Sequence, residues 1–114
     1  MAKPASAPPN HPVNIGYVCG ELTFGKAAEC FCVRPGDTIT WKLQHKMPFF
    51  ITIKSLISPL DITTVIRQKG EDIEATVLRH AVPGIYKYAV GAWDGKELLV
   101  LDPEIIVRPP DGRG

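Results

Sequence analysis

Several features that would assign a function are absent from this sequence. There is no apolar run near the ~18 residues of a membrane-spanning helix, so no membrane span is predicted. The 13 basic and 12 acidic residues are interspersed, giving a net charge of +1, with no run of about five like charges. Proteins that bind nucleic acid usually carry a basic stripe, so nucleic acid is not an expected partner.

Motifs for catalysis are also missing. Neither Ser55 nor Ser58 lies in a G-x-S-x-G elbow, and no glycine-rich phosphate-binding loop is present. Asp94 and Glu97 are close in sequence, but solvated loop charges are the simpler interpretation of this pair. We therefore expect a protein that is not an enzyme.

Cysteine is scarce and odd in number, with only Cys19, Cys30 and Cys32. Without an export signal, the expectation is reduced, buried thiols. A disulfide from Cys19 to either of the others is one alternative. Another is a soft-metal site, in which three thiolates with His45 would suit Zn²⁺ or Cu(I). Alternate residues on a strand lie about 7 Å apart, so chelation would require a local kink.

The two ends of the chain differ in composition from its middle. Residues 1–11 are rich in proline and alanine and lack the apolar core of a signal peptide, so a disordered arm is expected. Residues 109–114 begin with consecutive prolines and are expected to form a disordered tail. A single domain over 12–108 remains. The expected compartment is the cytoplasm, and a mature exported protein with its signal removed is the alternative.

Alternation of apolar and polar residues predicts short strands along the whole domain. No helical period is visible, and the interval 20–28 is predicted to be a connection. The Pro35-Gly36-Asp37 turn precedes a strand whose inward residues include Trp41, which is predicted to be buried. The pattern predicts an all-β, antiparallel Greek-key sandwich of about seven or eight strands. The predicted strands are 12–19, 29–33, 38–44, 49–54, 73–78, 85–90, 98–101, 104–107 and, less regularly, 62–66.

Three segments together resemble the cupredoxins, the superfamily of plastocyanin and azurin. They are Val33-x-Pro35-Gly36-Asp37-Thr38-Ile39-Thr40-Trp41, Pro48-Phe49, and Pro83-Gly84-Ile85-Tyr86-Lys87-Tyr88. Residues 102–107 match the final strand of that family, so the resemblance covers about residues 12–108. It implies a Greek-key sandwich.

The resemblance does not extend to the type-1 copper ligands. Such a centre needs two imidazoles and a thiolate with a weak axial ligand. The first histidine position is Phe49 and the cysteine position is Val90. No His, Cys or Met occurs from Gly91 to Gly114. We therefore expect no copper cofactor and apolar packing in its place.

These observations favour a copper-free interaction or structural module that acts by protein–protein contact. The apolar loop end is the expected contact surface, formed by Met47, Phe49, Phe50 and Trp93. The run Leu98–Leu101 is apolar at every position, which predicts a homodimer with Leu99 or Leu101 in the contact, unless loop 57–70 covers it. The alternatives are a thiol-based metal or redox protein using the three cysteines, and a small-molecule site.

Overall fold

The computed structural model describes residues 9–25 and 30–110. In this part of the chain no helix is long and apolar enough to cross a membrane. The strands are β1 (Asn10–Val18), β2 (Glu21–Phe24), β3 (Cys30–Val33), β4 (Thr38–Leu43), β5 (Phe49–Ile53), β6 (Thr64–Arg67), β7 (Ile73–Thr76), β8 (Gly84–Trp93), β9 (Leu98–Leu101) and β10 (Glu104–Val107).

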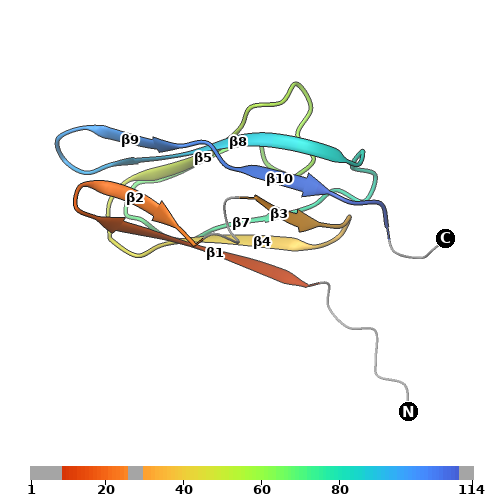
Figure 1. Cartoon of the computed structure of the whole chain (residues 1–114), viewed down its shortest axis with the longest axis horizontal. Coiled ribbons are helices and arrows are strands. Elements are labelled where there is room, and N and C mark those ends of the chain that lie inside the picture. The colour runs from red at the N-terminus through yellow and green to blue at the C-terminus, as the bar shows by residue number, and fades with distance from the viewer. Residues whose placement is uncertain (1–8, 26–29, 111–114) are drawn as a thin grey trace, which may run out of the picture.

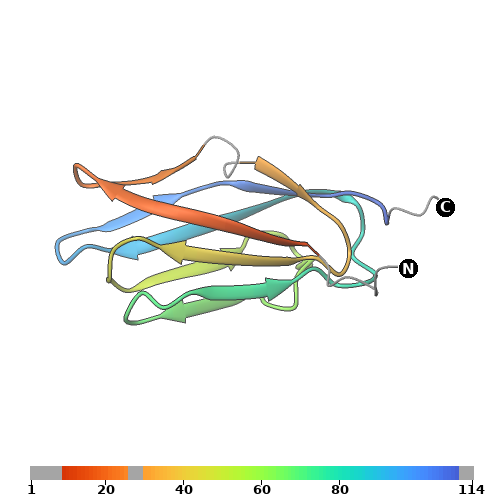
Figure 2. The ribbon, with the colours of Figure 1, turned by 90° about the horizontal axis from the view of Figure 1, so that it is seen from below.

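The strands form two stacked sheets, seen edge-on in Figure 1 and from the four-stranded side in Figure 2. One sheet has the order β2-β1-β4-β7, and the other has the order β3-β10-β8-β5-β6 with β9 also paired to β8. The predicted all-β sandwich is confirmed. Two pairings, β1 with β4 and β10 with β3, are parallel rather than antiparallel. They are parallel because the chain crosses between the sheets before it returns beside these strands.

The strand β2 lies in an interval that was predicted to be a connection. It spans only four residues between two glycines, which left too little alternation to recognise. It pairs antiparallel with β1, and Leu22 is buried on its inward side. The hairpin therefore adds an edge strand to the four-stranded sheet.

The core is centred on Trp41, which is 0% exposed, as predicted. Its ring meets Tyr88 of the opposite sheet edge-on, with centroids 5.6 Å apart. The Trp41 Nε1 donates a hydrogen bond to the Tyr88 hydroxyl at 3.1 Å. The contact joins the two layers, since Trp41 lies on β4 and Tyr88 on β8.

The strand β1 begins at Asn10, two residues earlier than predicted, and so includes His11. His11 Nε2 lies 2.9 Å from Asp37 Oδ2, and Asp37 also accepts the Arg34 backbone N–H at 3.0 Å. The Asn10 side chain accepts hydroxyl hydrogen bonds from Thr38 and Thr40. These contacts hold the start of β1 against β4. Of the predicted arm and tail, residues 1–8 and 111–114 lie outside the described residues.

Candidate interaction surface

The two positions that the cupredoxin resemblance assigns to copper ligands are filled by hydrocarbon. Phe49 is 1% exposed and Val90 is 0% exposed, and both belong to the hydrophobic core. Phenyl and isopropyl groups have no lone pair to donate to a metal. The burial also removes Phe49 from the predicted contact surface, because alternation on β5 turns this residue inward. Met47 is half-buried and packs against the same core.

The three cysteines are exposed and unpaired, so the expectation of buried thiols is wrong. Cys30 and Cys32 lie on the outward face of β3 because Phe31 and Val33 occupy its inward face. Cys19 lies in the β1–β2 turn with a φ of 53°. No three His, Cys, Asp or Glu side chains of the described residues are grouped to hold a metal, so the set with His45 is not assembled.

The Cys30 thiol does not have the character of a reactive thiolate. Its Sγ lies 3.8 Å from Glu104 Oε1. Desolvation, followed by the charge of this carboxylate, raises the pKa of Cys30 above its ordinary value. Reactive cysteines have lowered pKa values. The environment of Cys30 therefore favours the protonated thiol.

A polar cluster fastens the β8–β9 hairpin to β1. The Tyr17 hydroxyl donates to Asp94 Oδ2 at 3.0 Å, and the His45 ring meets Tyr17 edge-on with centroids 5.4 Å apart. Asp94 Oδ1 accepts the backbone N–H groups of Lys96 and Glu97 at 2.8 and 2.9 Å. Hydrogen bonds from Glu97 and then Lys96 lower the pKa of Asp94. The carboxylate closes the hairpin turn, which gives it a structural role.

The β8–β9 hairpin turns a row of apolar side chains outward. Trp93 is 46% exposed and pairs directly across the hairpin with Leu98, which is 55% exposed. Val100 follows on the same face at 49% exposed. Leu99 and Leu101 are half-buried and pack against the core. The outward leucine and valine, rather than the two leucines named from the sequence, therefore present side chains to solvent.

The outward row continues across the neighbouring strands. Gly91 pairs with Val100 on one side and with Phe50 on the other, and Phe50 pairs with Ile66. Ile66 is 57% exposed, and a Cβ added at Gly91 would overlap the Phe50 ring. The row therefore spans β6, β5, β8 and β9 on the face that points away from the four-stranded sheet (Figure 1).

We call this surface the apolar hairpin face, and it consists of Phe50, Ile66, Trp93, Leu98 and Val100. Sequence reasoning named Phe50 and Trp93 and missed the other three. The missing signal was the register of the Asp94-Gly95 hairpin, which places Leu98 opposite Trp93.

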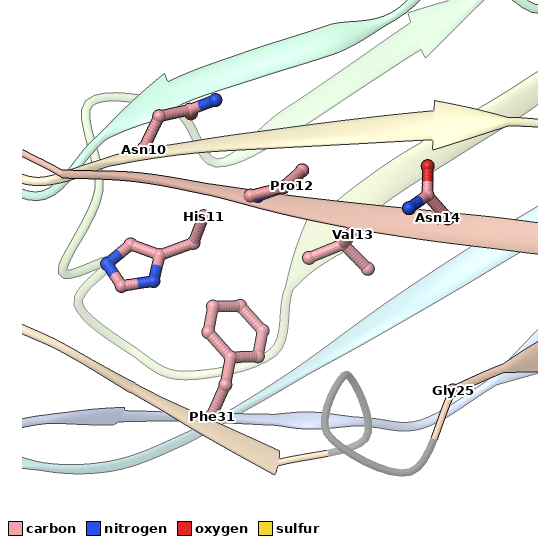
Figure 3. A pocket seen from close by; sticks show the side chains of 7 residues that line it. All are labelled: Asn10, His11, Pro12, Val13, Asn14, Gly25 and Phe31. Atoms are coloured by element: carbon pink, nitrogen blue, oxygen red, sulfur yellow. The ribbon is translucent and has the colours of Figure 1, made fainter.

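Hollows also lie elsewhere among the described residues. One hollow of about 370 Å³ lies between the start of β1 and β3, and the ring centroids of His11 and Phe31 are 6.1 Å apart there. The two side chains point toward each other (Figure 3). The His11 ring of this hollow is already hydrogen-bonded to the Asp37 carboxylate. A more apolar groove of about 520 Å³ lies between the β5–β6 loop and the β7–β8 turn, beside exposed Leu56 and Val82. It lies at the opposite end of β8 from Trp93.

No family model and no curated protein matches the sequence. Solved structures are similar in fold. The Cu-containing nitrite reductase (NirK) from Thermus scotoductus SA-01 has a TM-score of 0.55 at 17% identity, covering 96% of this chain and 25% of that chain. The chain thus spans a quarter of that enzyme chain's length. A Cu(I) mutant of amicyanin has a TM-score of 0.51 at 15% identity, covering 85% of this chain and 82% of that chain.

Proposed function

Because the chain has a cupredoxin-like fold, in which Phe49 and Val90 stand where the resemblance places copper ligands, we propose a function based on contact rather than metal chemistry. The protein is a non-enzymatic interaction module that works through the apolar hairpin face. Its partner is a second copy of the same chain.

One observation carries this proposal: an unbroken apolar row on the outer face of four adjacent strands. Three of its side chains, Ile66, Leu98 and Val100, are about half exposed or more, and Trp93 is nearly so. Single exposed apolar residues are ordinary, but a contiguous apolar surface marks an interaction site. Aromatic residues are enriched in such contacts, and both Phe50 and Trp93 belong to the row.

The charges around β9 support a second copy as the partner. Lys96 and Glu97 precede the strand and Asp102 follows it, so both signs flank the apolar row. A surface of this kind complements itself when one copy is turned by a two-fold rotation, the commonest symmetry of oligomers. A partner that carried charge of one sign would leave part of this border unmatched.

The proposal includes no type-1 copper cofactor. Its support is the chemistry of Phe49 and Val90, whose hydrocarbon side chains fill the core at those positions. The alternative of a thiol-based metal or redox protein has less support. Cys19 lies in a turn of one sheet, whereas Cys30 and Cys32 lie on an edge strand of the other.

Sedimentation velocity over a dilution series tests the proposed self-association. The wild-type protein should shift from the 12.5 kDa chain mass toward twice that mass as concentration rises. Leu98→Lys should keep the protein monomeric, because burying the new ammonium against an apolar surface is costly. Leu56→Lys is the matched control, since Leu56 is also exposed but lies outside the hairpin face. A wild-type monomer at every concentration, or equal behaviour of the two folded variants, contradicts the proposal.

A further inference from the structure

The edge of β9 has the properties of a strand-pairing site. We infer that the second copy adds its own β9 to this edge in antiparallel orientation, about a two-fold axis at Leu99. The two six-stranded sheets then become one continuous sheet. This inference rests on the proposed self-association and assigns its geometry.

The alternation of hydrogen-bonded and non-hydrogen-bonded pairs along the hairpin shows where the backbone groups of β9 point. The Asp94 N–H donates to the Glu97 carbonyl at 3.3 Å, which closes the hairpin ladder. The Trp93 N–H donates at 3.0 Å to the Pro48 carbonyl, on the β5 side of β8. Trp93 and Leu98 are therefore a non-hydrogen-bonded pair of the antiparallel ladder.

The same alternation applies to the rest of β9. Leu99 and Leu101 form the hydrogen-bonded pairs with β8, and Val100 repeats the arrangement of Leu98. The N–H and C=O groups of Leu98 and Val100 must then point away from β8, toward the outer edge of the sheet. No hydrogen bond within the described residues joins this edge to another strand. In the part of the chain that the structure describes, the edge thus offers two residues whose outward donors and acceptors bond to no other strand.

Nothing in β9 protects this edge in the usual ways. Its four residues contain no proline, lysine or other charge, which are the common means of preventing edge pairing. The nearest strand, β2, belongs to the other sheet (Figure 1). It comes close to β9, and Glu21, Leu22 and the whole of β9 line a groove of about 320 Å³. Within the described ranges 9–25 and 30–110, no strand pairs with the outer edge of β9.

The register of the pairing follows from Leu98 and Val100, the two residues of β9 whose backbone groups point away from β8. Pairing Leu98 with Val100 of the second copy, and Val100 with Leu98 of the second copy, uses every outward backbone group of β9. A shift by two residues would leave half of them unused. In the favoured register Leu99 faces itself across the two-fold axis.

Charge complementarity supports this register independently. Centring the pair on Leu99 places Lys96 opposite Asp102 of the second copy, and the symmetry repeats the contact at the other end. Opposite charges at facing positions stabilise cross-strand pairs. The pairing also brings the two apolar hairpin faces side by side on one joined sheet, so the Leu98 side chain of each copy contacts Val100 of the other copy.

A site-specific disulfide tests the two-fold position. In a background where Cys19, Cys30 and Cys32 are changed to serine, Leu99→Cys should form a covalent dimer in a glutathione redox buffer. Residues facing each other in a non-hydrogen-bonded pair lie within the range of a disulfide. The matched control is Leu101→Cys, which is half-buried on the same face. Its copy would lie about 13 Å away along the strand, so it should not cross-link.

Charge exchange tests the ends of the pairing. Lys96→Asp and Asp102→Lys should each weaken the dimer about tenfold or more, because each sets like charges opposite one another. An equimolar mixture of the two variants should restore wild-type affinity, since each mixed pair has opposite charges again. Asp102 also accepts from Lys54 at 2.7 Å, so Lys54→Gln is the control and should leave the dimer unchanged.

The outcomes separate the two levels of the proposal. A wild-type dimer with fast Leu101→Cys cross-linking, or with no recovery in the charge mixture, refutes the β9 register and leaves self-association in place. A wild-type protein that remains monomeric at every concentration refutes both. Selective Leu99→Cys cross-linking with recovery in the mixture establishes the register.

Discussion

Truncating Trp41 tests the packing between the two sheets. The Trp41→Ala substitution removes the largest buried side chain of the core. It also removes the hydrogen bond to the Tyr88 hydroxyl and the edge-on ring contact. These interactions join β4 to β8, so the substitution acts on the contact between layers rather than on one strand.

The expected cost is large relative to the stability of a single domain. Deleting a buried tryptophan costs about 3–5 kcal/mol. The Tyr88 hydroxyl, left without its donor in a site that raises its pKa by burial, adds about 1 kcal/mol or more. Domains of this size have a free energy of unfolding of about 5–15 kcal/mol. Trp41→Ala should therefore lower the melting temperature by on the order of 15–25 °C, or leave the chain unfolded.

Urea unfolding followed by far-UV circular dichroism measures this loss of stability. Further variants separate the contribution of the ring from that of the hydrogen bond. Trp41→Phe keeps most of the ring, Tyr88→Phe removes only the hydroxyl, and the double variant removes both partners. The double-mutant cycle should give a coupling of about 1 kcal/mol for the hydrogen bond. A Trp41→Ala protein that melts within about 1 °C of wild type would refute the reasoning, since no fully buried tryptophan is deleted so cheaply.

The other predictions concern the hairpin, its turn and the core. Gly91→Ala should destabilise the fold by about 1–3 kcal/mol in urea unfolding, and Phe50→Ala should relieve this cost because the added methyl overlaps the Phe50 ring; additive effects would contradict the contact. The lowered pKa of Asp94 makes its contribution present above the ordinary carboxyl pKa and lost below it, so the melting temperature should fall as pH drops below about 4. Asp94→Asn should show a smaller fall over that range, and an identical fall would exclude this residue as the cause. Cu(II) added to the purified protein should give no intense band at about 600 nm; a thiolate-to-copper band that survives chelator would overturn the assignment of Phe49 and Val90.

Local sequence patterns were enough to predict the corner and the burial of Trp41. The Pro35-Gly36-Asp37 turn and the alternation after it are both encoded within a few residues, and Gly36 has the expected positive φ of 92°. The parallel pairing of β1 with β4 could not be predicted in this way. It depends on how the chain passes between the sheets, which is set by contacts distant in sequence.

The interaction surface was predicted only in part, for a related reason. Every position of Leu98–Leu101 is apolar, so alternation cannot show which side chains face the core. The Asp94 turn decides this by setting the hairpin register, and it turns Leu98 outward. The cysteines illustrate the reverse case. Residue type favours burial for Cys30. However, Cys30 lies on an edge strand, and its neighbour Phe31 takes the inward face, so Cys30 is exposed.

Amide hydrogen exchange of β9 across a concentration series tests the central claim most directly. The N–H groups of Leu99 and Leu101 bond to β8 within one chain, so their exchange should be slow at every concentration. Those of Leu98 and Val100 should exchange rapidly in dilute protein and slowly in concentrated protein, as a second copy covers the edge. Exchange of Leu98 and Val100 that stays rapid at all concentrations would contradict pairing of two copies through β9.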